Sequence, residues 1–177
     1  MSPPAPSDRL AFVAGVVAAA PGERVLEVGC GAGVLVTALA EAVGHGAVVA
    51  VDRSPRMADA ATRRNRAAVA AGRVRVLAGP LLDADLAGER VDAVVAVDVR
   101  AFWTPPAPEW DVVARVLAPG GRVVLGYSVM GPGDRDRVPA ALAGPAGERG
   151  FAVTATAEAA TVPFPTAAIE LRRPGAG

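Results

Sequence analysis

Hydrophobic positions along this chain fall into two kinds of pattern, which alternate. Short runs rich in valine and alanine predict strands at 24–28, 47–52, 74–78, 91–97 and 122–127. Between them, apolar residues three or four positions apart predict helices at 33–43, 55–71 and 110–117. The run 91–97 is almost wholly apolar, which is typical of a strand buried on both faces of a parallel sheet.

The N-terminal part predicts a helix that covers this sheet. Ser7 suits the N-cap of a helix over residues 8–19, in which Leu10, Val13 and Val17 share one face. The same apolar run resembles the core of a signal peptide, but Asp8 cancels the charge of Arg9, and we therefore expect a cytoplasmic protein that does not associate with membranes. Residues 1–6 are rich in proline and are expected to be a loose end.

The C-terminal part closes the pattern with two more strands. A helix is expected near 137–143, and residues 151–156 and 166–171 predict an antiparallel hairpin at the sheet edge. Repeated strand–helix units closed by a hairpin indicate an α/β fold with a doubly wound, Rossmann-like sheet. We find no internal repeat and no boundary, so residues 1–177 are expected to form a single domain.

The first strand runs directly into three glycines at alternate positions, Gly29, Gly31 and Gly33. Glycine adopts backbone angles that a sharp strand-to-helix turn requires, and it lets a ligand lie against the backbone near the positive end of the helix. A dinucleotide fingerprint would place its third glycine at position 34, which is Val34, so an oxidoreductase using a nucleotide cofactor is disfavoured.

Glu27 precedes these glycines by two residues, and the whole segment resembles the first motif of the class I S-adenosylmethionine (SAM)-dependent methyltransferases, in particular the small type 11-like domain. The resemblance extends from about Val25 to Tyr127 and includes a leucine–x–proline–glycine–glycine turn at 117–121. It implies a seven-stranded sheet, mostly parallel with an antiparallel C-terminal strand, and SAM bound over the carboxyl ends of the first four strands. The implied cofactor-binding residues in this segment are Glu27, Gly29, Cys30, Gly31 and Gly33.

The second strand ends in Asp52, about twenty residues beyond the glycines. A carboxylate at this place accepts hydrogen bonds from both hydroxyls of a ribose, which favours that role over a simple helix cap. Arg53 and Met57 are expected to pack on the adenine, although a solvated arginine and a core methionine are the alternatives.

The third strand departs from the family at its end. Related enzymes often carry an acid here that binds the adenine amino group, whereas this chain has Pro80 and Leu81, with Asp83 further on. Proline offers neither an amide hydrogen nor a carboxylate, so the contact with the adenine amino group is lost or moves to Asp83. We still expect Pro80 and Leu81 to form the adenine pocket.

The fourth strand brings Val97 to the cofactor and ends in Asp98. We expect Asp98 to bind the cofactor ammonium or to accept a proton from the acceptor, and the alternative is a surface acid paired with Arg100. Phe102 and Trp103 resemble an aromatic pair of the family and, together with Tyr127 on the next strand, are the expected acceptor pocket. The alternative is that these aromatic side chains fill the core.

The charge balance and the cysteine count limit the kinds of partner and metal site that we expect. The 18 basic residues balance 18 acidic ones, so no excess charge favours nucleic acid or an acidic membrane. All the basic residues are arginine. The single cysteine, Cys30, excludes an internal disulfide and, with His45 as the one histidine, leaves no soft-ligand metal cluster.

These residues predict methyl transfer from SAM to a nucleophilic atom of a small molecule. The alternative is a non-catalytic SAM-binding or regulatory module, suggested by Pro80 and by the short segment that precedes residue 151. Since the methyl group of SAM is already activated, positioning and exclusion of water supply most of the acceleration, and Asp98 is the candidate base where the acceptor must lose a proton.

Overall fold

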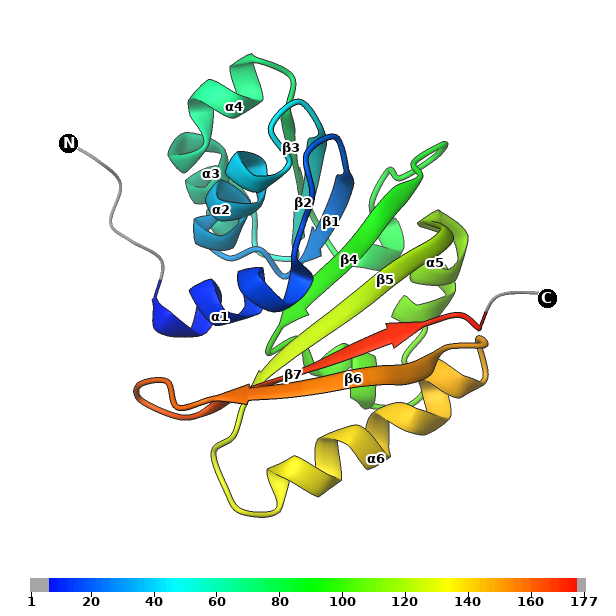
Figure 1. Ribbon diagram of the computed structural model, residues 1–177. Coiled ribbons are helices and arrows are strands. Elements are labelled where there is room, and N and C mark those ends of the chain that lie inside the picture. The colour runs from blue at the N-terminus through cyan, green and yellow to red at the C-terminus, as the bar shows by residue number, and fades with distance from the viewer. Residues whose placement is uncertain (1–6, 175–177) are drawn as a thin grey trace.

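The computed structural model describes residues 7–174, which form a seven-stranded sheet with helices on both faces (Figure 1). The strands are Arg24–Val28 (β1), Ala47–Asp52 (β2), Val74–Ala78 (β3), Val91–Val97 (β4), Leu117–Ser128 (β5), Ala152–Ala159 (β6) and Thr166–Arg172 (β7). Their order in the sheet is β3-β2-β1-β4-β5-β7-β6. Strands β1 to β5 pair in parallel, and β7 runs antiparallel to both β5 and β6. The predicted fold class is confirmed.

The strand order reverses at β1, which lies between β2 and β4. Val28 is level with Val51 of β2 and with Ala96 of β4, and the chain continues from β1 into α2 on one face of the sheet and from β4 into η2 and α5 on the other. A crevice forms at such a switch point because the two following connections diverge over opposite faces of the sheet. The glycine turn after β1 lies at this point.

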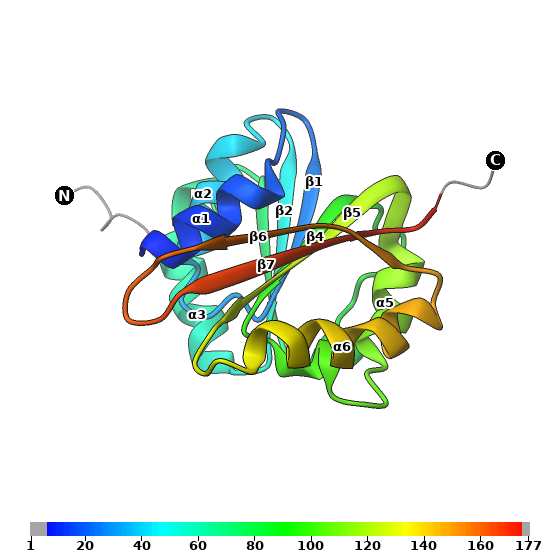
Figure 2. The same cartoon turned by 60° about the horizontal axis from the view of Figure 1, so that its bottom comes forward.

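The helices divide between the two faces of the sheet, as Figures 1 and 2 show. One face carries Asp8–Val17 (α1), Val34–Ala42 (α2), Pro55–Arg64 (α3) and Arg66–Ala70 (α4). The other carries Glu109–Val116 (α5) and Asp134–Gly147 (α6), with the short 3₁₀ helices Leu81–Asp83 (η1) and Arg100–Trp103 (η2). The predicted covering helix at the N-terminus is α1, whose Val13 and Val17 are fully buried.

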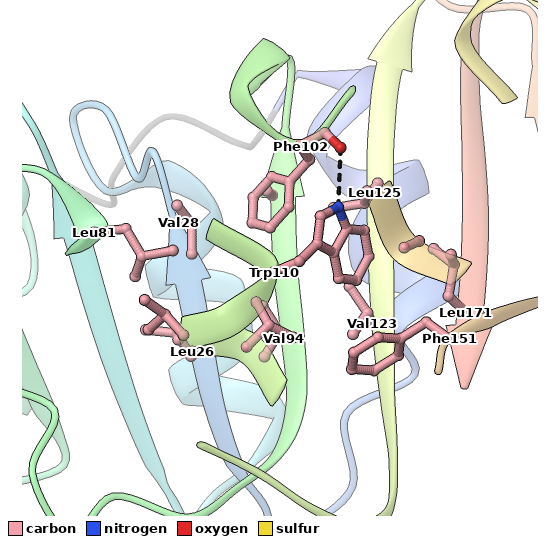
Figure 3. Packing of buried hydrophobic residues seen from close by; sticks show 14 of the residues in the cluster. Leu26, Val28, Leu81, Val94, Phe102, Trp110, Val123, Leu125, Phe151 and Leu171 are labelled. Carbon is pink, nitrogen blue, oxygen red and sulfur yellow. Dashed lines mark hydrogen bonds between the residues drawn. The ribbon is translucent and has the colours of Figure 1, made fainter. Parts of the chain in front are cut away.

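The core on the α5 side is organised around Trp110 (Figure 3). Its indole Nε1 donates a 2.9 Å hydrogen bond to the carbonyl oxygen of Phe102, so the buried donor has a partner. The two rings meet edge to face, 5.4 Å between centroids. Phe151 packs against the other side of Trp110, with the two ring centroids 5.0 Å apart. This cluster fixes η2 against α5 and therefore fixes the backbone that follows β4.

Helix α6 extends beyond both ends of the helix expected near 137–143, and two other elements differ more from the sequence prediction. The helix expected over 55–71 is broken at Asn65, where φ is −100° and the side-chain amide donates to the carbonyl oxygens of Gly33 and Ala61. The fifth strand begins earlier than expected because Leu117 already pairs with Val91, before the proline–glycine turn interrupts the register. Both differences come from tertiary contacts that local propensity does not contain.

Residues 1–6, predicted as a loose end, lie outside the described residues. Within residues 7–174, every helix is too short or too polar to cross a membrane. The cytoplasmic location inferred from the sequence stays a prediction.

Candidate active site

The glycine turn between β1 and α2 leaves room for a ligand at one specific position. Gly29, Gly31 and Gly33 have φ of +73°, +52° and +77°, which residues with side chains rarely adopt. A Cβ on Gly29 would meet Cγ2 of Val99 at 2.6 Å, whereas a Cβ on Gly31 would meet no atom within 4 Å. The backbone at Gly31 therefore borders open space, as the backbone of a cofactor cradle must.

Gly33 has a different reason to be glycine. A Cβ there would lie 2.8 Å from Cα of Ala61 and 2.7 Å from Nδ2 of Asn65, so it would collide with α3. Gly33 was expected to contact the cofactor; the structure places it at the crossing of α2 and α3 instead. Its carbonyl oxygen accepts the 3.0 Å hydrogen bond from Asn65, and Thr37 donates to Oδ1 of Asn65 at 2.8 Å.

Asp52 lies at the carboxyl end of β2 and joins it to the glycine turn. Its Oδ2 accepts a 2.8 Å hydrogen bond from the amide of Gly31, and its Oδ1 accepts one of 2.9 Å from the amide of Ser54. Only 8% of Asp52 is exposed. Each carboxylate oxygen has two lone pairs, so one on each oxygen stays available for a diol. Asp52 can therefore accept hydrogen bonds from the two backbone amides and from the two hydroxyls of a ribose at the same time.

Glu27 is buried beneath the turn, with 4% of its surface exposed. Its Oε2 has no hydrogen-bond partner within residues 7–174. Burial raises the pKa of this carboxyl well above its ordinary value, and the nearby charge of Asp52 raises it further. A buried polar atom without a partner is uncommon, and it marks a place where a bound group supplies the missing hydrogen bond.

Cys30 turns its side chain away from the crevice and into the core beside α1 and α2. Burial raises the pKa of its thiol to about 12, with smaller contributions from Glu27 and Asp52. A thiol in this state is a poor nucleophile because the reactive thiolate is disfavoured. The side chain of Cys30 is thus part of the core, and the expected contact of this residue with the cofactor stays a prediction.

A cleft of about 660 Å³ opens between the glycine turn and the ends of β2, β3 and β4. Of the residues predicted to bind the cofactor, those that line it are Gly29, Asp52, Arg53, Pro80, Leu81 and Val97. Met57 is 38% exposed and is not part of the lining, and its expected adenine contact stays a prediction. Val28, Val99 and Glu109 line the cleft as well, which the sequence did not indicate. We refer to this space as the cofactor cleft.

Pro80 and Leu81, which follow β3, form one wall of the cofactor cleft. Pro80 precedes η1, and Leu81 is the first residue of that helix, with 6% of its surface exposed. Asp83 lies at the far end of η1 and is not among the residues that line the cleft. This wall of the cleft is therefore apolar, and its expected role as an adenine pocket stays a prediction.

A second cleft, of about 520 Å³, lies against α6 and η2. We refer to it as the acceptor cleft, after the acceptor pocket expected from Trp103 and Tyr127. Trp103 and Tyr127 line it, with their rings in edge contact at 6.3 Å, and Met130 and Val138 add apolar surface. Asp98 and Arg100 line this acceptor cleft and the cofactor cleft alike. The two spaces therefore meet at the end of β4.

Asp98 holds three parts of the molecule together at this junction. Its Oδ1 accepts a 2.7 Å hydrogen bond from the amide of Ser128, and its Oδ2 accepts from the hydroxyl of Ser128 and forms an ion pair with Arg9 of α1. The partner of Asp98 is thus Arg9, and the alternative of a pair with Arg100 is wrong. Asp98 has φ of +56°, a conformation that non-glycine residues rarely adopt and that clusters at functional sites.

The structure corrects the expected acceptor pocket in one respect. Phe102 has none of its surface exposed and packs on Trp110, so it belongs to the core. Successive residues of a 3₁₀ helix point in different directions, which separates Phe102 from Trp103. Arg9 and Ser128 are the residues at this site that sequence reasoning missed. They lie 89 and 30 positions from Asp98, and no local signal connects them to it.

The sequence of residues 25–121 matches the family model described as "Methyltransferase domain". This chain belongs to that family. The match begins in β1 and ends as β5 begins, so it contains the glycine turn, Asp52 and the junction at Asp98. The cofactor of the family is SAM, and the open cradle at Gly31 and the orphaned Oε2 of Glu27 fit the binding of such a group.

Two curated relatives show how the family varies. Ribosomal protein L11 methyltransferase from Pelotomaculum thermopropionicum is 43% identical over 110 residues, which are 59% of this chain and 32% of that protein. Arsenite methyltransferase from Halobacterium salinarum is 38% identical over 109 residues, 61% of this chain and 28% of that protein. This chain thus spans about a third of the length of the curated relatives it matches.

A solved SAM-dependent methyltransferase from Aquifex aeolicus superposes on 95% of this chain and 90% of its own, with a TM-score of 0.75 and 19% identity. At this identity the similarity shows the fold. It extends over both faces of the sheet and the C-terminal hairpin, which the matched family segment does not include.

Proposed function

We propose that this protein transfers a methyl group from SAM to a nucleophilic atom of a small molecule that binds in the acceptor cleft. The observation that carries the proposal is the junction of two clefts at Asp98 and Arg100. One cleft has the features of a cofactor cradle, and the other combines the rings of Trp103 and Tyr127 with apolar and charged side chains, among them Asp134 and Arg137. A methyl donor and an acceptor held on either side of Asp98 would meet at one point.

The chain would hold SAM by four kinds of contact. Asp52 offers one free lone pair on each oxygen to the ribose, and Gly31 provides bare backbone. Pro80 and Leu81 provide an apolar wall for the adenine. Glu27 supplies an acceptor whose hydrogen-bonding capacity is unused within residues 7–174. These contacts come from the ends of β1, β2 and β3, which the folded sheet brings together.

SAM supplies an activated methyl group, so the protein's contribution is positioning and exclusion of water. Trp103 and Tyr127 would orient the acceptor because they present flat surfaces next to the junction. Tyr127 is only 4% exposed, and burial raises the pKa of its hydroxyl, so it stays protonated and serves as a hydrogen-bond donor at neutral pH.

Asp98 is the candidate base for an acceptor that must lose a proton. Its Oδ2 forms an ion pair with Arg9 and accepts a hydrogen bond from the hydroxyl of Ser128. Its Oδ1 accepts a hydrogen bond from the amide of Ser128. Removal of an essential general base costs about 10² to 10⁴-fold in rate. A loss of that size in kcat for Asp98→Asn, with SAM affinity unchanged, would support the role of base. An unchanged kcat would leave Asp98 as the residue that fixes α1 to β5.

The size of the acceptor cleft favours a small molecule. Its volume of about 520 Å³ lies in the range that a compact organic ligand fills. The chain as a whole is neutral, so it lacks the overall charge excess of many proteins that bind bulk nucleic acid. The names of the relatives include both a ribosomal-protein methyltransferase and an arsenite methyltransferase, and they leave the acceptor to experiment.

Two measurements test this function. Calorimetric titration with SAM tests the cofactor cleft, and we expect binding that Asp52→Ala weakens. Formation of S-adenosylhomocysteine across a panel of small acceptors tests catalysis. SAM binding without turnover on any acceptor would favour the non-catalytic module, which the apolar wall at Pro80 and the ion pair of Asp98 also permit. Absence of SAM binding would refute both.

A further inference from the structure

A third cleft, of about 680 Å³, lies away from the two described above, between α2 and the junction of α3 with α4. Its basic residues are Arg63, Arg64, Arg66 and Arg73, and one carboxylate, Glu41, lines it. The remaining walls include alanine and glycine, with small side chains that leave the guanidinium groups accessible. We refer to this space as the arginine cleft.

In the part of the chain that the structure describes, the arginines of this region lack the acidic partners that most other arginines have. Between residues 53 and 73 the chain contains six arginines and one acid after Asp52, Asp59. Within residues 7–174, none of these six arginines forms an ion pair, whereas eight of the other twelve do. In a chain whose total charge is zero, this segment concentrates unneutralised positive charge. Such a concentration attracts anions.

Two of the arginines that line the cleft are held in place by backbone carbonyls. Arg64 donates through Nε to the carbonyl oxygen of Ala32 at 2.9 Å, and Arg73 donates through Nη1 to those of Ala40 and Gly44. These bonds leave other N–H groups of both guanidiniums unused. Arg63 and Arg66 are exposed and make no side-chain hydrogen bond within residues 7–174. Guanidinium groups in this arrangement match phosphate oxygens, which accept paired N–H donors.

The same cleft touches the support of the glycine turn. Arg64 holds the carbonyl oxygen of Ala32, and Asn65, which also lines the cleft, holds that of Gly33. Both carbonyls belong to the turn that borders the cofactor cleft. A ligand that restrains Arg64 and Asn65 would therefore restrain the backbone beside Gly31, and cofactor binding would need less ordering.

We propose that the arginine cleft binds a small, multiply charged phosphate ligand and that its occupancy strengthens the binding of SAM. The cleft has the volume for a compact ligand, four guanidinium donors and no aromatic residue in its lining on which a nucleobase would stack. These features favour recognition of phosphate groups over recognition of bases. The thermodynamic linkage is reciprocal, so SAM would strengthen phosphate binding by the same factor.

The test uses tripolyphosphate as the probe, titrated by calorimetry at low ionic strength into the full chain. The variant Arg63→Gln with Arg66→Gln removes two charges whose side chains make no hydrogen bond within the described residues. The matched control, Arg90→Gln with Arg115→Gln, removes the same charge from the region of α5, on the other face of the sheet. We expect the first variant to lose about tenfold or more in tripolyphosphate affinity, and the control to change little.

The linkage is measured by titrating SAM with and without saturating tripolyphosphate. We expect about a fivefold gain in SAM affinity for the unmodified chain, and no gain for the Arg63/Arg66 variant.

Equal loss of phosphate affinity in both double variants, or no binding at millimolar probe, would overturn the site. Phosphate binding without any change in SAM affinity would overturn the linkage. Binding of a single-stranded RNA in place of tripolyphosphate, lost in the same variant, would overturn the small-ligand assignment in favour of a nucleic-acid surface. SAM binding without the probe is measured in the same titrations, so failure here is distinct from failure of the proposed function.

Discussion

The amide of Gly31 donates a 2.8 Å hydrogen bond to Oδ2 of Asp52, and this contact connects the turn after β1 to the end of β2. The amide of Ser54 donates to the other oxygen of the same carboxylate. Two consecutive βα connections are thus tied to one buried side chain. The arrangement fixes both the bare backbone and the carboxylate before any ligand arrives, which lowers the entropy cost of binding one.

Replacement of Asp52 by alanine should weaken SAM binding by about 1.5–3 kcal/mol, the range for hydrogen bonds to a charged group. It should also lower the free energy of unfolding, because two backbone amides lose their acceptor. Calorimetry and urea denaturation measure the two effects. Asp59→Ala is the matched control, since Asp59 is an exposed carboxylate on α3. Unchanged SAM affinity in Asp52→Ala would remove the ribose assignment.

Replacement of Gly31 by valine should abolish SAM binding while the protein remains folded. The new side chain would enter the open space beside the turn, where SAM is proposed to lie, and its Cβ would meet no atom of residues 7–174 within 4 Å. Gly88→Val controls for backbone strain, because Gly88 also has a positive φ, +75°, and open surroundings. The two variants should lose similar stability in thermal denaturation. Normal SAM binding by Gly31→Val would show that this turn is not the site.

Phe102 and Trp103 are adjacent in sequence, and their alanine variants should behave differently. Phe102→Ala leaves a cavity against Trp110 and should cost about 3–5 kcal/mol of unfolding free energy. Trp103→Ala removes part of the acceptor cleft and should raise the KM for the acceptor by about tenfold, at unchanged SAM affinity. Denaturation and steady-state kinetics distinguish the two results. Similar destabilisation with no KM effect would place both rings in the core.

Replacement of Glu27 by glutamine should stabilise the protein at neutral pH. The folded state raises the pKa of Glu27, so the folded protein retains a proton that the unfolded chain releases above about 4.5, the ordinary value for glutamate. Stability is therefore full below that pH and falls as the pH rises toward the folded-state pKa. At a pH above the folded-state pKa, each unit by which folding raises the pKa corresponds to about 1.4 kcal/mol less free energy of unfolding.

Urea denaturation of the unmodified chain and of Glu27→Gln, from pH 4 upward, checks this dependence. The difference between the two proteins should vanish near pH 4 and grow in favour of the variant toward neutral pH. A difference that does not depend on pH would mean that Glu27 does not titrate differently in the folded state. The same variant should keep the shape of the turn, because glutamine has the same size as glutamate.

The ion pair between Arg9 and Asp98 should contribute little to stability despite its position. About a third of each side chain is exposed, 34% for Arg9 and 38% for Asp98, so solvent screens the attraction. A double-mutant cycle with Arg9→Ala and Asp98→Ala should give a coupling energy of about 0.2–1 kcal/mol that decreases with added salt. A coupling energy of several kcal/mol would show that this pair is a major anchor of α1.

The amino-acid sequence by itself determined β1 to β4, most helices and the glycine turn that follows β1. Apolar runs and glycine spacing are local signals, and they placed β1, β2, β3 and β4 at the bounds seen in the structure. The acid at the end of β2 followed from the same logic, because in a parallel sheet the carboxyl ends of neighbouring strands share one edge.

Only the tertiary structure decided which side chains meet at the junction of the two clefts. Arg9 reaches Asp98 across 89 positions of sequence, Phe102 turns into the core while Trp103 faces the acceptor cleft, and Gly33 is required by the approach of α3. These outcomes depend on packing between elements far apart in the chain. Local propensity and spacing cannot contain them, because the partner of each residue is chosen only when the sheet and its helices assemble.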